Sequence, residues 1–130
     1  MPGSVRTVAR STPDDVLAAQ LSGAASYAIN HRMTREQAIA HLHAITTRPD
    51  LLARAAGIIA GASKLGMCDW PTELAHARLL VAAGADREAL AGWIAQGIDN
   101  VQRTWAHGPV TKPDPELVAA VLAEVLDGLD

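Results

Sequence analysis

A chain of 130 residues with 49% hydrophobic and 19% charged residues has the size and balance of one globular domain, which excludes a disordered chain. A single cysteine, Cys68, excludes an intrachain disulfide. No uncharged apolar run approaches the ~20 residues of a membrane-spanning helix, and the N-terminus lacks the apolar core of a signal peptide. The sequence therefore predicts a cytoplasmic protein that does not enter a membrane.

The net charge of −3 is unevenly distributed along the chain. Residues 1–65 hold seven Lys/Arg and four Asp/Glu, whereas residues 66–130 hold four and ten. A basic first half and an acidic second half can attract each other within the fold or across a dimer, and the basic half can also attract nucleic acid. The excess of Arg over Lys and the abundance of Ala indicate a GC-rich genome, that of a bacterium or its phage.

Helix-end signals and apolar spacing predict helices throughout the chain, and no segment alternates as a β-strand does. We expect residues 1–11 to form a flexible basic arm and residues 12–130 a single helical domain. Thr12 is a candidate N-cap for a first helix that ends near residue 30. The Thr34–Gln37 segment, TREQ, has the pattern of a capping box and predicts a second helix over residues 35–46.

The segment 50–64, DLLARAAGIIAGASK, is apolar around nearly its whole circumference, which is typical of a helix enclosed by neighbours. Only Arg54, Ser63 and Lys64 could face DNA bases, so the segment is a poor candidate for a recognition helix. Its spacing of Gly57 and Gly61 allows another backbone to come close. We expect an all-α protein, a compact orthogonal or bundle-like domain of five to six short helices, with this Ala/Gly-rich helix at its centre.

Three further helices follow, over residues 70–83, 86–105 and from 115 onward. Gly84 is a candidate left-handed residue at the end of the first of these. The last helix carries a broad apolar face, more than a small domain needs, and we expect part of it to pack across a two-fold axis. The residues predicted to form this interaction surface are Val118, Leu122, Val125 and Leu129.

The titratable residues form no recognisable catalytic or metal-binding pattern. His41 and His43 are two residues apart on a predicted helix, so their side chains point about 160° away from each other and cannot chelate one metal ion. The acidic pairs, Asp14 with Asp15 and Asp114 with Glu116, stand at predicted helix starts, where the helix dipole explains them. We therefore predict no enzymatic activity, no metal and no cofactor.

Three functions are compatible with these features. The first is a non-enzymatic adaptor or accessory protein, homodimeric, that binds another protein. The second is a DNA-associated regulatory protein, although the pI near 5.9 counts against it; its phosphate-binding residues would be Arg6, Arg10, Arg32, Arg35 and Arg48. The third is a small-ligand-binding protein with a pocket between helices, walled by Trp93 or Trp105.

Overall fold

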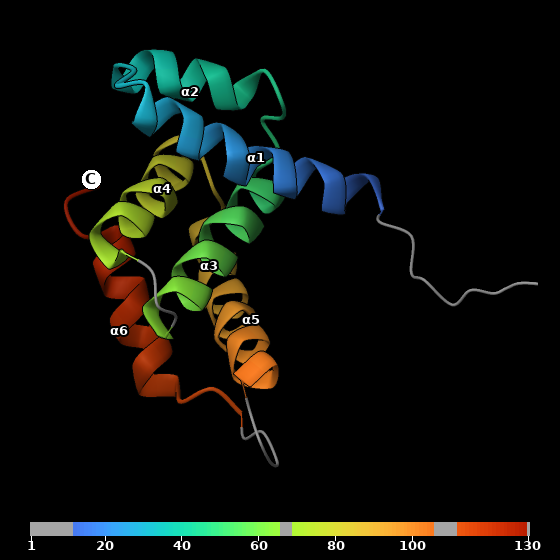
Figure 1. The fold of residues 1–130 in the computed structure, drawn as a ribbon, viewed down its shortest axis with the longest axis vertical. Coiled ribbons are helices and arrows are strands. Elements are labelled where there is room, and N and C mark those ends of the chain that lie inside the picture. The colour runs from blue at the N-terminus through green and yellow to red at the C-terminus, as the bar shows by residue number, and fades with distance from the viewer. Residues whose placement is uncertain (1–11, 66–68, 106–111, 130) are drawn as a thin grey trace, which may run out of the picture.

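The structure, a computed structural model, describes residues 12–65, 69–105 and 112–129. All the regular elements in these ranges are α-helices, which confirms the predicted all-α class (Figure 1). None of these helices is long and apolar enough to cross a membrane. The predicted arm, residues 1–11, lies outside the described residues. The helices are α1 (Pro13–Asn30), α2 (Arg35–His43), α3 (Pro49–Leu65), α4 (Trp70–Ala82), α5 (Arg87–Trp105) and α6 (Pro115–Leu126).

The first two helices begin at the predicted capping residues. The Thr12 hydroxyl accepts the backbone N–H of Asp15, and the Asp15 carboxylate accepts the backbone N–H of Thr12. Thr34 and Gln37 form the same reciprocal pair at the start of α2. Gly84, with φ of 113°, follows α4 in the predicted left-handed conformation. These three helix ends are encoded by residues close to them in the sequence.

α2 ends earlier than its predicted limit at residue 46. Nε2 of His43 lies 2.6 Å from the carbonyl oxygen of Ala83, beyond the end of α4. The Thr46 hydroxyl accepts the backbone N–H of Arg48, a turn contact that competes with a further helical turn. Similarly, α6 ends before Gly128, which has φ of 70°. A contact with a distant residue and local turn geometry set these limits, and the apolar spacing contains neither signal.

The central position predicted for the third helix is confirmed. α3 packs against α1, α4, α5 and α6. Figure 1 shows α1 and α2 lying across one end of the molecule, above the other four helices. Because α3 is enclosed, residues around most of its circumference are buried, and these are Leu51, Leu52, Ala53, Ala55, Ala56, Gly57, Ala60, Gly61 and Ser63.

The two helices α3 and α5 meet backbone to backbone at glycines. A Cβ atom added to Gly57 would lie 2.9 Å from the backbone nitrogen of Ile94, and one added to Gly61 would lie 3.0 Å from the carbonyl carbon of Ile94. On the facing helix, a Cβ at Gly97 would lie 2.6 Å from the carbonyl oxygen of Ile58. Only a residue without a side chain fits these gaps, so the predicted close approach at Gly57 and Gly61 is confirmed.

Candidate ligand-binding site

A pocket of about 520 Å³ lies between the last turn of α1, the start of α2 and one face of α4. Three arginines line it, Arg32, Arg35 and Arg78, and no acidic side chain does so among the described residues. The other lining residues are apolar, and half of them are alanine, whose short side chains leave space between the facing helices. The apolar lining residues are Ala28, Ile29, Met33, Ala38, Ala75, Leu79, Ala82 and Leu129.

Arg32 has an unusual backbone conformation, with φ of 53°. It follows His31, the C-cap residue of α1. The N–H of Arg32 donates to the carbonyl oxygen of Ile29 at 3.1 Å, and the N–H of Met33 donates to that of Ala28 at 3.0 Å. This is a Schellman motif, whose left-handed position is usually glycine, since any other side chain costs about 1 kcal/mol there. An arginine therefore stands on the pocket rim at an energetic cost.

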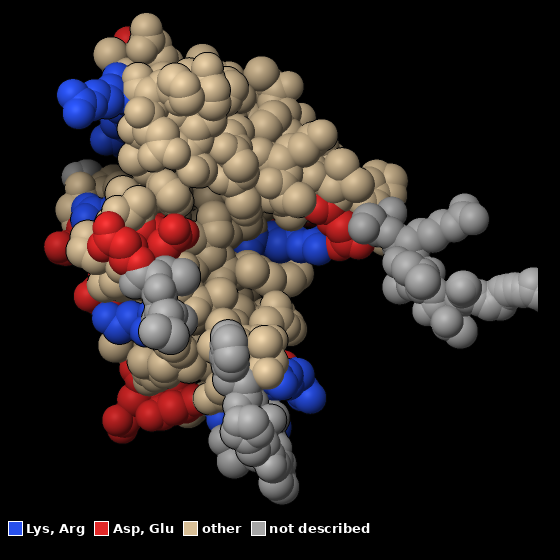
Figure 2. All heavy atoms as spheres, viewed as in Figure 1, with Lys and Arg blue, Asp and Glu red and all other residues tan. Residues whose placement is uncertain are grey.

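The arginines on the rim differ in their partners. Arg32 and Arg35 are exposed, and neither guanidinium group forms an ion pair or hydrogen bond with another described residue. Arg78 donates a hydrogen bond to the backbone carbonyl oxygen of Asp127, in the turn that follows α6. Figure 2 shows Lys and Arg side chains gathered at the upper left edge of the molecule, where α1 meets α2 in Figure 1. The rim can therefore hold an anion.

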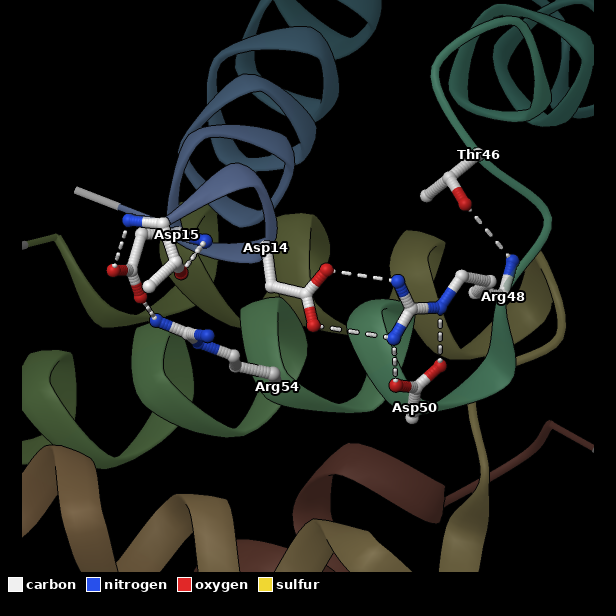
Figure 3. Close-up of polar contacts among 7 residues, drawn as sticks. Asp14, Asp15, Thr46, Arg48, Asp50 and Arg54 are labelled. Atoms are coloured by element: carbon white, nitrogen blue, oxygen red, sulfur yellow. Dashed lines mark hydrogen bonds and ion pairs between the residues drawn. The ribbon is translucent and has the colours of Figure 1, made fainter.

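Arg48 does not line the pocket and is paired with two carboxylates instead (Figure 3). Its guanidinium group donates two hydrogen bonds to Asp14, of 2.8 and 3.2 Å, and two to Asp50, of 3.1 and 2.6 Å. Its charge is thus balanced by two carboxylates where α1 meets α3. Of the five arginines predicted to bind phosphates, Arg32 and Arg35 are brought together, and Arg6 and Arg10 lie outside the described residues.

Arg54, one of the two cations of α3, links this helix to the start of α1. It donates a hydrogen bond to Asp15 (Figure 3), and its guanidinium group lies 5.4 Å from the ring centroid of Trp93. Hydrogen bonds from Arg54 and from the backbone N–H of Thr12 lower the pKa of Asp15 to about 2. The Arg48 guanidinium likewise lowers the pKa of Asp50.

These lowered pKa values predict a loss of stability in acid. A carboxylate whose pKa is lowered in the folded state stabilises the fold above its unfolded pKa, which is about 4, and this contribution disappears as the pH falls through the folded value. Arg54→Met should therefore have a lower free energy of unfolding than the wild-type protein at neutral pH. This difference in free energy should become smaller as the pH falls from about 4 to about 2. Urea unfolding followed by circular dichroism measures this.

Arg35→Gln is the matched control for this titration, because Arg35 has no carboxylate partner among the described residues. The difference in free energy of unfolding between this variant and the wild-type protein should be the same at every pH. If the difference in free energy of unfolding between Arg54→Met and the wild-type protein stayed constant from about pH 4 to about pH 2, the assigned role of the Arg54–Asp15 pair would be wrong.

The predicted interaction surface on α6 takes part in the protein's own core. Val125 is fully buried, and Val118, Leu122 and Leu129 are partly buried against the core. α6 packs against α3, α4 and α5, and this packing takes up much of the apolar face that the sequence shows in excess. The large hydrophobic residues that are exposed in the described ranges lie elsewhere, at Val16, Tyr27 and Leu65. Dimerisation through α6 stays a prediction.

The tryptophans expected in a pocket wall are not among the residues that line this pocket. Trp93 is half-buried against α3, beside Gly57 and next to the Arg54 guanidinium. The side chain of Trp105 lies outside the described residues. Sequence reasoning missed Arg78, because its approach to the α1–α2 turn depends on how α4 packs. The sequence did contain one sign of the site itself: Arg32 stands between the end of one predicted helix and the capping box of the next, at a position where glycine is usual.

In the described ranges, no three His, Cys, Asp or Glu side chains gather as they would around a metal ion. Comparisons of the chain with protein-family models, with curated proteins and with solved structures gave no match. The pocket's own geometry is therefore the basis for interpreting its function.

Proposed function

We propose that this chain is a non-enzymatic binding protein whose pocket between α1, α2 and α4 binds an anionic ligand that also has an apolar part. The observation that supports the proposal is the pairing of an arginine rim with an apolar floor. Arginine presents a planar fork of N–H donors that matches carboxylate and phosphate oxygens. The floor favours an apolar group, because burying it releases water from both surfaces. The volume of about 520 Å³ lies within the usual range of small-molecule sites.

This proposal keeps a ligand pocket between helices, as one sequence-based hypothesis did, but places it away from the expected tryptophans and on two arginines of the nucleic-acid hypothesis. A nucleic acid backbone presents phosphates and sugars, which have no apolar part to fill a floor of alanine, isoleucine and leucine. Arg48, the third described arginine of that hypothesis, is already paired with Asp14 and Asp50. The pocket thus favours a compact amphipathic anion over a phosphate backbone.

The test uses anilinonaphthalenesulfonate, a sulfonate on an apolar aromatic body, as the probe. We expect saturable binding, seen as increased probe fluorescence, with amide NMR shifts concentrated at the lining residues of α1, α2 and α4. Arg35→Gln should weaken binding by about tenfold or more, because a hydrogen bond between charged groups contributes about 1.5–3 kcal/mol. Arg35 occupies the first turn of α2, where a positive charge is unfavourable, so its removal should not destabilise the helix.

Arg103→Gln is the matched control, because it removes the same charge from an exposed position on α5. Arg103 pairs there with Asp99 at 2.7 Å, outside the pocket. This variant should bind the probe as the wild-type protein does. The proposal would be overturned if Arg35→Gln and Arg103→Gln lost the same affinity for the probe. It would also be overturned if the amide NMR shifts were confined to residues outside the pocket.

A further inference from the structure

We infer that the ligand of this pocket is a single-chain amphiphile: an acyl or alkyl chain that ends in a carboxylate or a phosphate. The inference rests on the proposed function and specifies the chemical class of its ligand. Three features carry it: the chemistry of the floor, the contrast between floor and rim, and the volume.

The floor contains no polar side chain among the described residues. Its alanines, Ile29, Met33, Leu79 and Leu129 offer neither a hydrogen-bond donor nor an acceptor, and the backbone groups of the helices that carry most of them are already paired within the helices. A sugar, a nucleobase or an extended peptide placed there would leave its own polar groups unpaired, which costs about 1–3 kcal/mol for each buried group. A hydrocarbon chain has no such groups. The floor therefore selects a chain of methylenes over a peptide.

The most buried residues that line the pocket are apolar, although one apolar lining residue, Ala75, is exposed. Ala28 and Ala38, at the floor, are 1% and 4% exposed, whereas Arg32 and Arg35 are exposed on the rim. A ligand that fits this arrangement buries an apolar body and keeps its anionic end near the solvent. A molecule with one charged end and one hydrocarbon end has that shape.

The volume limits the length of the chain. The pocket, about 520 Å³ in volume and open to solvent on one side, lies in the range of sites that hold small molecules. A single chain of about twelve carbons with its headgroup is a ligand of that size class. Longer chains would extend into solvent and gain no further affinity.

The test is displacement of anilinonaphthalenesulfonate by the straight-chain acids from hexanoate to tetradecanoate, each kept below its micelle concentration. We expect affinity to rise by about fourfold per methylene, the equivalent of ~0.8 kcal/mol, and to stop rising near dodecanoate. Decyl phosphate and decanoate distinguish the two headgroups by their relative affinity. Decyltrimethylammonium has the same tail with a cationic end and should not displace the probe.

Two variants separate the tail from the headgroup. Ala75→Leu places a larger side chain in the pocket from an exposed position of α4, so the fold can accommodate it. With Ala75→Leu, affinity should stop rising at an acid shorter than dodecanoate, and the affinity for hexanoate should stay unchanged. Arg35→Gln should lower the affinity of every acid by the same factor and keep the slope per methylene. Ala19→Leu, at an exposed position of α1 outside the pocket, is the control. It should change neither the affinity for the acids nor the chain length at which affinity stops rising.

The outcomes distinguish this inference from the proposed function. If the probe binds and depends on Arg35, but affinity does not rise with chain length, the ligand class is wrong and the proposed function stands. If an acidic amphipathic peptide displaces the probe more strongly than dodecanoate, a protein partner replaces the amphiphile. If the probe does not bind at the pocket, both are wrong.

Discussion

Replacing Gly61 with alanine is expected to lower the free energy of unfolding by about 3 kcal/mol or more. The added methyl group would lie 3.0 Å from the carbonyl carbon of Ile94 and closer still to its oxygen. Both are backbone atoms of α5, so relief requires the two helices to separate along their whole contact. The intrinsic preference of helices for alanine, worth about 1 kcal/mol, is too small to compensate.

Gly23→Ala and Gly92→Ala are the controls for this substitution. Nothing lies within 4 Å of a Cβ added at either position, and Gly92 belongs to α5, the same helix that Gly61 contacts. Both variants should therefore raise the free energy of unfolding by up to about 1 kcal/mol. Urea unfolding followed by circular dichroism compares the three. Stabilisation by Gly61→Ala similar to that of Gly92→Ala would show that α3 and α5 do not meet as described.

Arg32→Gly is expected to change stability and binding in opposite directions. Glycine adopts the left-handed conformation without the steric cost that Arg32 bears at φ of 53°, so the fold should gain about 1 kcal/mol. The same substitution removes one guanidinium group from the pocket rim. Anilinonaphthalenesulfonate should then bind about 10- to 100-fold more weakly, because the lost contact is a hydrogen bond between charged groups.

Arg32→Lys is the control for this pair of effects. It retains a side chain in the left-handed position and a positive charge, so its stability should match the wild-type protein and its affinity should fall only in part. Unfolding curves and probe titrations on the same samples give both quantities. A less stable Arg32→Gly would mean that the side chain supports the fold. A more stable variant with unchanged affinity would mean that the pocket does not use Arg32.

The sequence predicts those features of the fold that depend on neighbouring residues. Thr12 and Thr34 cap their helices because each hydroxyl needs only the residue three positions ahead. The central position of α3 follows from its apolar circumference, and the spacing of Gly57 and Gly61 predicts a close backbone contact, but only the structure identifies α5 as the partner. The end of α2 is different, since His43 reaches a carbonyl group 40 residues away.

The site could be predicted only in part, because some of its residues meet only through contacts between segments far apart in the sequence. Arg32 and Arg35 were singled out as anion-binding residues, and they do lie together on the rim. Arg78 and Leu129 join them only through the packing of α4 and the turn after α6, which no local pattern specifies. Arg48 belonged to the same predicted group, but a bidentate contact with Asp14, 34 residues away, places it elsewhere.

The glycine contact between α3 and α5 also determines how cooperatively the chain unfolds. Each glycine inside a helix costs about 1 kcal/mol relative to alanine, and Gly57, Gly61 and Gly97 place this cost on both helices. These glycines lower the intrinsic helix propensity of both helices, so each helix depends for part of its stability on its contact with the other. An intermediate that retains one of them without the other is disfavoured. Since α1 and α4 pack on α3, a ligand of the proposed pocket would stabilise the whole domain as one unit.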